Sequence, residues 1–458
     1  MTSKLIFFIL CASLVLSTLL YGAVHQPILA LFYLSMSLVL ILWAIHIFST
    51  GELRFSKSPL QIPLLATIIY GIFQIIPFGY TTIADVENIP KTISADPFAT
   101  KLAVIHFFAL LVYFAALLTY TDSVKRLRKL VLLVIIFGSI YAFYAIIQSV
   151  ISPGKIYGIY ESKFAQPFGS FVNRHSYAAF IEMSIAMTLG ILFAGAVSKD
   201  KRLLYLTATG LMAVSLLLSG SRGGLIAFLS SVMFLIFITT DTNSKAKLAL
   251  KFALVLTFLI AVIAGTILVG GESTLTRIVE TTQSQDITTN RIHIWSVTLK
   301  VISSSPIFGV GLGAFPQAYT KFDSLSGLER VEQAHNDYLQ ILADAGIFGL
   351  IFAGLFALWL FRAGFQNIKT ENKFRRAVAV GALSGCFAIF VHSIFDFVLH
   401  VTAISLLFLT LTAIVVLSGQ KFPDDEPETP RKRRRKRQVA EKIPINPKIQ
   451  SHGETISE

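Results

Sequence analysis

Apolar residues in this chain occur in long unbroken runs, and short charged clusters separate the runs. The hydrocarbon core of a bilayer is about 30 Å thick, so a helix that crosses it needs about 20 mostly apolar residues. The backbone groups of a spanning segment must bond within that segment, which favours helices. The pattern predicts about twelve spans: 4–22, 27–49, 59–79, 102–120, 129–150, 176–196, 203–219, 224–240, 247–269, 338–361, 376–397 and 402–418.

The first apolar run could be mistaken for a signal peptide. It is long, no A-x-A cleavage site follows it, and a second run begins at once, so we expect residues 4–22 to form a helix. The spans 203–219 and 224–240 are separated only by a very tight glycine-rich turn.

Composition agrees with a membrane protein. Of the 458 residues, 54% are hydrophobic and only 14% are charged, and the mean hydropathy is +0.70. A soluble domain carries roughly 25% charged residues, so a water-soluble fold is excluded. Cys11 and Cys386 both fall inside predicted spans, which leaves no disulfide framework. No CxxC, HExxH or Cys/His cluster occurs, and this argues against a structural zinc or metalloprotease site.

Lysine and arginine are concentrated in alternate loops. The basic set lies at 54–57, 125–129, 199–202, 245–251 and 362–376, whereas the opposite short loops hold far fewer. Because cytoplasmic loops carry the excess of these residues, we expect both termini in the cytoplasm. The large polar loop 270–337 is then on the outer, periplasmic side.

The last forty or so residues differ from the rest. We divide the chain into a transmembrane domain, 1–418, and a tail, 419–458, which contains the basic run Arg431–Arg437. Such runs are usually disordered and solvated. Attraction to anionic lipid, worth ~1 kcal/mol per basic residue near the surface, is the alternative role. Nucleic-acid binding is the least favoured reading, and membrane lipids are the expected partners.

Three polar, glycine-rich stretches lie at the predicted outer face: 167–175, 219–224 and 290–338. In the second, glycines flank Arg222 and allow a ligand to approach the backbone closely. The following helix offers free N–H groups to an anion, and a guanidinium binds phosphate oxygens in a bidentate manner. Arg222 could instead reach lipid headgroups. Because charges at membrane depth are costly and tend to be functional, we favour an anion-binding role.

The third stretch holds two further candidates, Arg291 and His335. Apolar residues follow Arg291 at helical spacing: Ile292, Trp295, Leu299 and Ile302. This spacing predicts a helix on the membrane surface with its apolar side down, although Arg291 could simply face water. His335, beside Asn336 and Asp337, could act as a general base near neutral pH. A lone histidine in a loop is more often structural or incidental, so the chemistry alone favours neither interpretation.

Intramembrane polar residues form a fourth set. His392, Asp396 and His400 are four residues apart, which predicts one helix face near the outer end of the eleventh span. A polar patch bonded to neighbouring helices is at least as good an interpretation as a catalytic one, so His392 and Asp396 are secondary candidates. Glu182 and Asp344 are further acids without an assigned role.

Three motifs together resemble the bacterial O-antigen ligase and polymerase superfamily. They are S-G-S-R-G-G, then R-x3-W with P-x-x-G-x-G-x-G-x-F, then A-H-N-D-Y-L-Q with G-x-x-G-L. Each motif is short, but their order, their common side and the long loop before His335 make the combination specific. The resemblance covers roughly 165–400. The first 150 residues agree only in the pattern of spans.

The resemblance implies an all-α, polytopic inner-membrane glycosyltransferase of the GT-C type. Such enzymes take a glycan from undecaprenyl diphosphate and pass it to lipid A–core, to another repeat unit or to protein, without a metal or cofactor. By motif, the functional residues are the turn arginine Arg222, then Arg291 and His335. Asn173 and Arg174 match a family position more loosely. The basic tail matches nothing in the family pattern.

The implied chemistry agrees with the residues. Charge develops on the leaving diphosphate, and arginines in a water-poor site stabilise it. His335 would take the acceptor proton, and direct displacement would invert the anomeric carbon. The competing class is a transporter of lipid-linked glycans. Transporters usually bind substrates at midplane in broken helices and often have internal repeats. Here the polar motifs cluster at one face, which favours the enzyme.

The orientation can be tested by cysteine labelling. We expect a cysteine in place of Ser284 to react with a membrane-impermeant thiol reagent in intact cells that lack the outer barrier, because the loop 270–337 is outside. A cysteine in the tail serves as the control and should be protected. Labelling of the tail with protection at position 284 would overturn both the orientation and the placement of the site.

Overall fold

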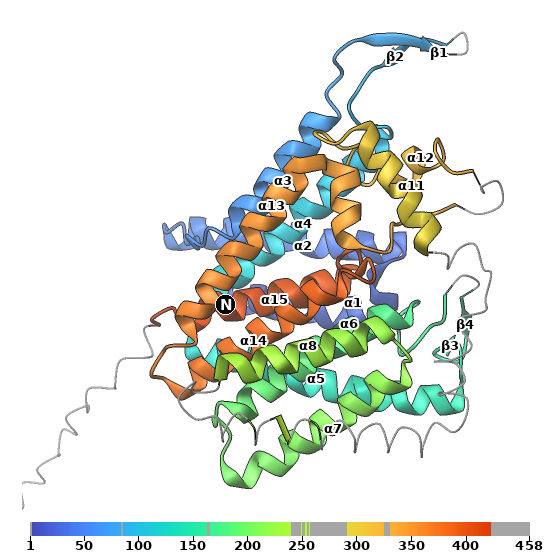
Figure 1. The fold of residues 1–458 in the computed structure, drawn as a ribbon. Coiled ribbons are helices and arrows are strands. Elements are labelled where there is room, and N and C mark those ends of the chain that lie inside the picture. Colours follow the sequence, from blue (N-terminus) through green and yellow to red (C-terminus); the bar gives the residue numbers. More distant parts are fainter. Residues whose placement is uncertain are drawn as a thin grey trace, which may run out of the picture.

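The computed structural model describes residues 2–83, 86–162, 165–239, 291–324 and 330–422, with a few isolated positions between 249 and 256. This part is mostly helical, as Figure 1 shows. The predicted span 247–269 lies almost wholly outside the described residues, as do residues 270–290 and the tail from 423 onwards.

Every other predicted span coincides with a helix. Nine helices in the described part of the chain are long and apolar enough to cross a membrane, and α3 and α15 are shorter apolar helices. The chain is therefore a mostly helical, multi-pass membrane protein. The helices are α1 (Thr2–Leu19), α2 (Gln26–Thr50), α3 (Gln61–Gln74), α4 (Pro97–Tyr120), α5 (Val124–Ile151), α6 (Arg174–Phe193), α7 (Arg202–Leu218), α8 (Arg222–Thr239), α13 (Asp337–Asn367), α14 (Lys373–His392) and α15 (Thr402–Ser418).

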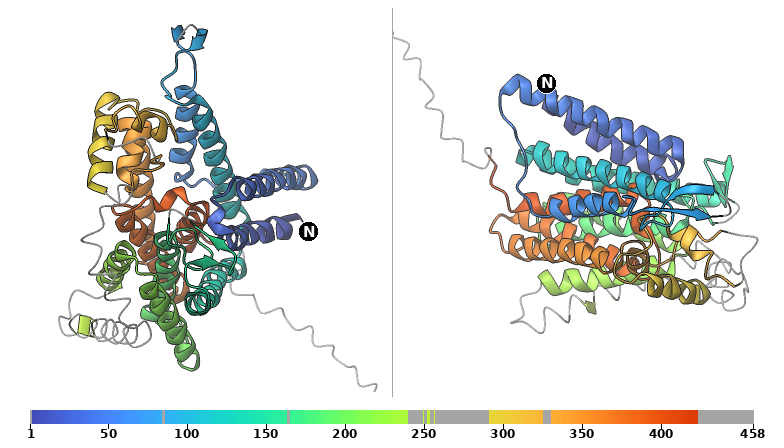
Figure 2. Two further views of the ribbon diagram at one scale, coloured as in Figure 1. Left: turned by 90° about the vertical axis from the view of Figure 1, so that its right-hand side faces the viewer. Right: turned by 90° about the horizontal axis from the view of Figure 1, so that it is seen from above.

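The centre of the bundle is the pair α6 and α14. Helix α6 is buried from Ser176 to Ile191, and α14 packs against α6, α8 and α15. Glycines bring the two central helices together: a Cβ on Gly190 would lie 2.2 Å from the Gly381 Cα. Small residues at such a crossing allow close backbone approach in a membrane protein. Helices α1 and α2 lie at the edge of the bundle, as both views of Figure 2 show.

Contacts between helix ends show which ends lie together. The Arg126 guanidinium donates to Ser3 Oγ at 2.8 Å, and the Arg128 guanidinium lies 5.0 Å from the centre of the Phe374 ring. Arg375 in turn donates to the Gln420 carbonyl. The start of α1 and the end of α15 therefore lie at the same end of the bundle.

Two short hairpins occur in connections that the sequence predicted only as loops. Strand β1 (Tyr80–Ile83) pairs with β2 (Val86–Pro90), and β3 (Lys155–Ile156) pairs with β4 (Tyr160–Glu161), both antiparallel. The first hairpin projects beyond the helices in Figure 1. Both lie in connections at the end of the bundle opposite the start of α1.

The helix predicted after Arg291 is present as α11 (Arg291–Ser304), which is followed by the short α12 (Phe315–Tyr319). The residues that pack inward differ from the predicted stripe: Ile294, Val297, Thr298 and Val301 are buried. Ile292 and Leu299 stay exposed. Helix α11 thus uses one face to pack against α13 and α12 and leaves a second apolar face uncovered.

The glycine-rich loop 306–313 packs against a kink in α13. Gly346 interrupts that helix with φ 59° and ψ −149°. The carbonyls of Ala343 and Asp344, freed by the kink, accept from the backbone N–H groups of Val310 at 2.8 Å and Gly311 at 3.0 Å. A Cβ on Gly346 would lie 2.3 Å from the Ile307 carbonyl oxygen. The loop therefore supplies hydrogen-bond donors to the carbonyls that the kink leaves free in α13, and its glycines permit the close approach.

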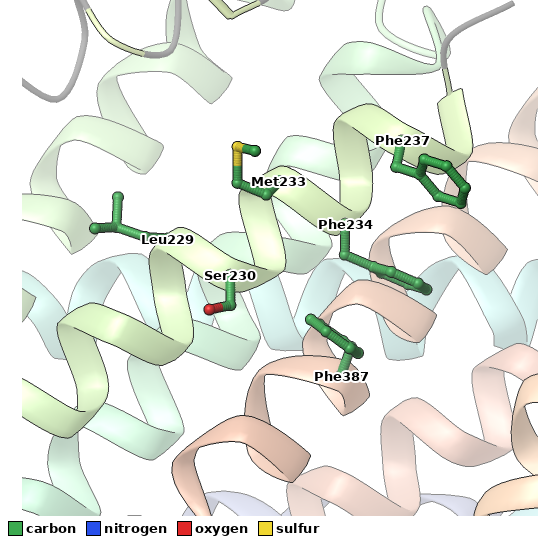
Figure 3. A pocket seen from close by; sticks show the side chains of 6 residues that line it. All are labelled: Leu229, Ser230, Met233, Phe234, Phe237 and Phe387. Carbon is green, nitrogen blue, oxygen red and sulfur yellow. The ribbon is translucent and has the colours of Figure 1, made fainter. Parts of the chain in front are cut away.

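A hollow on the side of the bundle lies between α8 and α14. Figure 3 shows Phe234 of α8 and Phe387 of α14 face to face, and their rings stack at 4.4 Å. The residues that line the hollow are Leu229, Ser230, Met233, Phe234, Phe237 and Phe387. This hollow holds no ionisable group and lies part-way along the helices, away from the polar stretches at their ends.

The glycine crossing of α6 and α14 gives a stability test. We expect Gly190→Ala to lower the free energy of unfolding by about 1–3 kcal/mol, because the added methyl group overpacks a close contact. The matched control is Gly354→Ala in α13, where an added Cβ meets nothing within 4 Å. It should be neutral or slightly stabilising, since alanine favours a helix interior by about 1 kcal/mol over glycine. Thermal unfolding in detergent measures both, and equal midpoints would contradict the packing.

Candidate functional site

The segment that follows α14 gathers the predicted functional residues. Helix α14 ends at His392, and the chain turns before the short helix η3 (Val398–His400). The prediction that His392, Asp396 and His400 share one helix face is therefore wrong. The Asn336 side-chain amide donates to the Ile394 carbonyl at 2.9 Å, which holds the turn in place of a further helical bond. Each of the three residues has a different partner.

Asp396 is the buried centre of this segment, with only 4% of its side chain exposed. Its Oδ1 accepts from the Phe397 N–H at 2.9 Å and lies 3.2 Å from His335 Nδ1. Its Oδ2 lies 3.6 Å from an Arg291 nitrogen. Arg291 also donates to the Phe395 carbonyl at 2.6 Å. The structure thus brings together His335 and Arg291, two of the residues predicted from sequence, on one carboxylate.

The charge state of Asp396 decides the proton position on His335. Burial opposes ionisation of this carboxyl, but His335, His175 and Arg291 hold the pKa of Asp396 well below its usual range. The carboxylate can therefore only accept, so the proton of a neutral His335 belongs on Nδ1. Nε2 then presents its lone pair from a side chain that is 27% exposed.

The backbone of His335 is held in an unusual conformation. Its φ is +49°, in the left-handed region that L side chains rarely adopt. The next residue, Asn336, caps α13 by accepting from the N–H groups of Tyr338 at 2.9 Å and Leu339 at 3.0 Å. The His335 ring packs edge-on against Phe397 at 4.9 Å. Conformations of this kind cluster at functional sites.

Asp337 ties the start of α13 to the same segment. Its carboxylate accepts from Ser393 Oγ at 2.8 Å and from the Leu399 N–H at 3.2 Å, and it lies 2.9 Å from His400 Nδ1. Burial disfavours the charged His400 imidazole, but Asp337 and Asp344 raise the pKa of His400 above its ordinary value. His400 therefore interacts with Asp337 rather than with Asp396.

The first turn of α8, which carries Arg222, lies against the same segment. A Cβ on Gly223 would lie 3.1 Å from the Phe395 Cβ. Ser221 Oγ accepts from the Gly224 N–H at 3.2 Å and lies 2.8 Å from His175 Nδ1. The Arg222 side chain is exposed at this turn. His175 and Ser221 were not predicted as site residues, although both lie inside the polar stretches 167–175 and 219–224.

Behind this turn lies a fully buried pair, Glu182 and His392. Both carboxylate oxygens of Glu182 lie close to His392 Nδ1, at 3.1 and 3.2 Å, and neither side chain is exposed. His392 Nε2 has no hydrogen-bond partner among the described residues. It sits 3.4 Å from the position that a Cβ on Gly223 would take. The structure therefore gives Glu182, which had no assigned role, a specific partner.

Asn173 and Arg174 lie beside the α8 turn. The Asn173 side chain caps α6 by accepting from the His175 N–H at 2.9 Å. The Arg174 guanidinium donates to Gln166 Oε1 at 2.6 Å, and a Cβ on Gly220 would lie 3.5 Å from it. Residues from all three polar stretches therefore lie together. The glycine loop 306–313 of the third stretch is the exception, because it packs against α13. Within the described ranges, no group of three His, Cys, Asp or Glu side chains is placed to hold a metal ion.

Comparison with known proteins identifies the domain that carries most of these residues. A family model described as O-Antigen ligase matches residues 207–354, which include Arg222, Arg291 and His335. No curated protein matches the chain. The matched residues run from α7 through α11 and α12 into α13 and so contain two of the three polar stretches. The chain is a multi-pass membrane protein with a domain of the O-antigen ligase family at residues 207–354.

Proposed function

We propose that the protein transfers a glycan from undecaprenyl diphosphate to an acceptor hydroxyl, such as one on lipid A–core, at the periplasmic face of the inner membrane. The observation that carries this proposal is the shared carboxylate of Asp396. It orients His335 as a base and lies 3.6 Å from Arg291, beside the α8 turn that bears Arg222. The match of residues 207–354 to the O-antigen ligase family supports the proposal.

The donor diphosphate binds at the α8 turn in this proposal. Arg222 lies in the first turn of an 18-residue helix, where N–H groups and the helix dipole favour an anion. Arg291 approaches from α11, and Arg174 lies on the far side of the turn near Gly220. Arginines suit this task because their planar fork matches two phosphate oxygens at once.

The chemical step is a displacement at the anomeric carbon. The acceptor oxygen forms a bond to that carbon while the bond from the carbon to the diphosphate oxygen breaks. The acceptor proton passes to His335 Nε2, and Asp396 stabilises the imidazolium that forms. The electron pair of the broken bond stays on the diphosphate, where the arginines stabilise it. Attack opposite the leaving group inverts the anomeric configuration.

The buried pair Glu182 and His392 acts as a positioning device in this scheme. His392 lies directly behind Gly223 and Gly224, and Glu182 fixes its ring through two short contacts. The pair does not reach solvent, so it touches no substrate. It supports the α8 turn from behind and so fixes the position from which Arg222 projects.

Replacement of the arginines tests the diphosphate site. We expect Arg222→Ala and Arg291→Ala each to lower kcat/KM by about 10²–10³, because removal of one preorganised donor costs about that much. Arg222→Lys should also be impaired, since a point charge does not reproduce the bidentate fork. The measurement is transfer from an undecaprenyl-diphosphate-linked glycan by purified protein in lipid. Lipid A–core and a second repeat unit, offered separately as acceptors, distinguish a ligase from a polymerase.

Three outcomes would contradict this scheme. Near-normal rates of both alanine variants would place the diphosphate elsewhere. Loss of activity on addition of EDTA would show that a metal ion takes part, against the expected metal-free reaction. Movement of the lipid-linked glycan across the bilayer, with no transfer to any acceptor, would favour a transporter.

The His335 and Asp396 pair gives a test of general-base catalysis. His335→Ala should lower kcat by about 10²–10⁴ with a smaller effect on donor binding, because a base acts in the chemical step. Asp396→Asn should lower kcat by acting through His335, so the double variant should be little worse than His335→Ala alone. The control is a second outer pair, His293 and Asp323, whose side chains lie 2.9 Å apart on the far side of α11. Full additivity at the first pair, or an equal loss in His293→Ala, would refute the assignment.

A further inference from the structure

Aromatic side chains from two distant parts of the chain gather beside the site. We name Tyr21, His25, Tyr144, Tyr157 and Tyr160 the tyrosine cluster. The Tyr21 ring lies 5.2 Å from that of Tyr160, 5.4 Å from His25 and 6.0 Å from Tyr157. His25 also lies 5.6 Å from Tyr160, and Tyr144 lies 5.8 Å from Tyr157. The cluster joins the α1–α2 connection to the β3–β4 hairpin.

The backbone at both sides of the cluster adopts left-handed conformations. Tyr21 has φ 58° and Ala23 has φ 54°, on either side of Gly22 at φ 70°. On the hairpin, Tyr157 has φ 55° and is followed by Gly158 at φ 72°. Left-handed residues other than glycine are uncommon and persist only where their surroundings hold them. Both strained segments place a tyrosine in the same cluster.

The cluster is continuous with the proposed transfer site. A Cβ on Gly22 would lie 2.7 Å from the Phe171 ring and 3.1 Å from Val401. Thr402 Oγ1 donates to the Ala23 carbonyl at 3.0 Å. Phe171 precedes the α6 cap, Asn173, by two residues, and Val401 follows the segment that carries Asp396. The turn that carries Tyr21 therefore packs on residues that adjoin the segments of Asn173 and Asp396.

The surface that the cluster presents combines apolar rings with hydroxyl groups. Tyr157 is 41% exposed, and Tyr21 and Tyr160 are partly exposed. The Tyr157 hydroxyl donates to the Leu19 carbonyl, whereas the hydroxyl groups of Tyr21 and Tyr160 make no hydrogen bond within the described part of the chain. A pyranose ring has an apolar C–H face and a rim of hydroxyl groups, so tyrosine offers it both a stacking surface and a hydrogen-bond partner.

We propose that the tyrosine cluster binds pyranose residues of the donor glycan, beyond the sugar that is joined to the diphosphate. This inference rests on the proposed function and adds a subsite to it. A donor whose diphosphate lies at the α8 turn reaches the cluster along the 171–174 segment. The subsite holds the growing or finished glycan at its distal sugars, while Arg222, Arg291 and His335 act on its reducing end.

The test uses donors with glycans of two lengths. We expect Tyr160→Leu and Tyr21→Leu to raise KM about tenfold for the full-length donor, the loss expected for one aromatic contact of about 1.4 kcal/mol. Their kcat should stay unchanged, as should KM for a donor cut back to its first sugar. Tyr160→Phe, which keeps the ring, should raise KM less than Tyr160→Leu does. The control Tyr80→Leu removes a 68% exposed tyrosine from the β1–β2 hairpin and should have no effect.

Equal rises in KM for both donor lengths, or the same rise in Tyr80→Leu, would overturn the subsite and make the cluster a membrane-interface anchor. A rise in KM for the acceptor alone would also overturn it. A binding measurement that does not depend on transfer uses the free glycan, released by mild acid from the lipid-linked pool of the source cells. Saturation-transfer NMR then detects its binding to the protein in nanodiscs. If wild-type protein binds this glycan through the tyrosines but transfers nothing, the subsite stands and the proposed function fails. If transfer is normal and the tyrosine variants bind the glycan as well as the wild-type protein does, the subsite fails and the proposed function stands.

Discussion

A carboxylate that is removed from water must be met by donors, and Asp396 is met by groups from three separate parts of the chain. The Phe397 amide is local, His335 comes from the start of α13, and Arg291 comes from the start of α11. Loss of any one leaves a buried charge poorly compensated, which is costly. The site is consequently complete only when α11, α13 and the link between α14 and α15 have all docked.

The positions of the helices could be predicted from sequence because burial in lipid is a local property of a run of residues. The pairing of polar groups could not. Glu182 and His392 are 210 residues apart, and the local sequence around either residue does not indicate the other as its partner. The four-residue spacing of His392, Asp396 and His400 misled for a related reason. The spacing assumes a continuous helix, whereas contacts from Asn336 and Asp337 end α14 at His392.

Local context identified the candidate residues of the site but not how they are held. Arg222 between glycines, and His335 beside an Asn–Asp pair, were recognisable as unusual. The contact between His175 and Ser221 could not be recognised from the sequence, because a histidine in the first turn of a span has many structural uses. Likewise Asn173 resembles a ligand-binding residue in sequence, but its side-chain oxygen caps α6. The hairpin β3–β4 and the left-handed turn at Tyr21 contact each other through aromatic rings, and neither has a recognisable signature in the sequence.

The kink at Gly346 has a consequence for how the glycine-rich stretch 306–313 is understood. The glycines between 306 and 313 allow the loop to close over a broken helix, and none of the contacts they make reaches His335 or Arg222. A stretch of this kind records how α13 is bent. A side chain at Gly346 would therefore disturb the site only indirectly, by changing the course of the helix whose first residue lies two positions after His335.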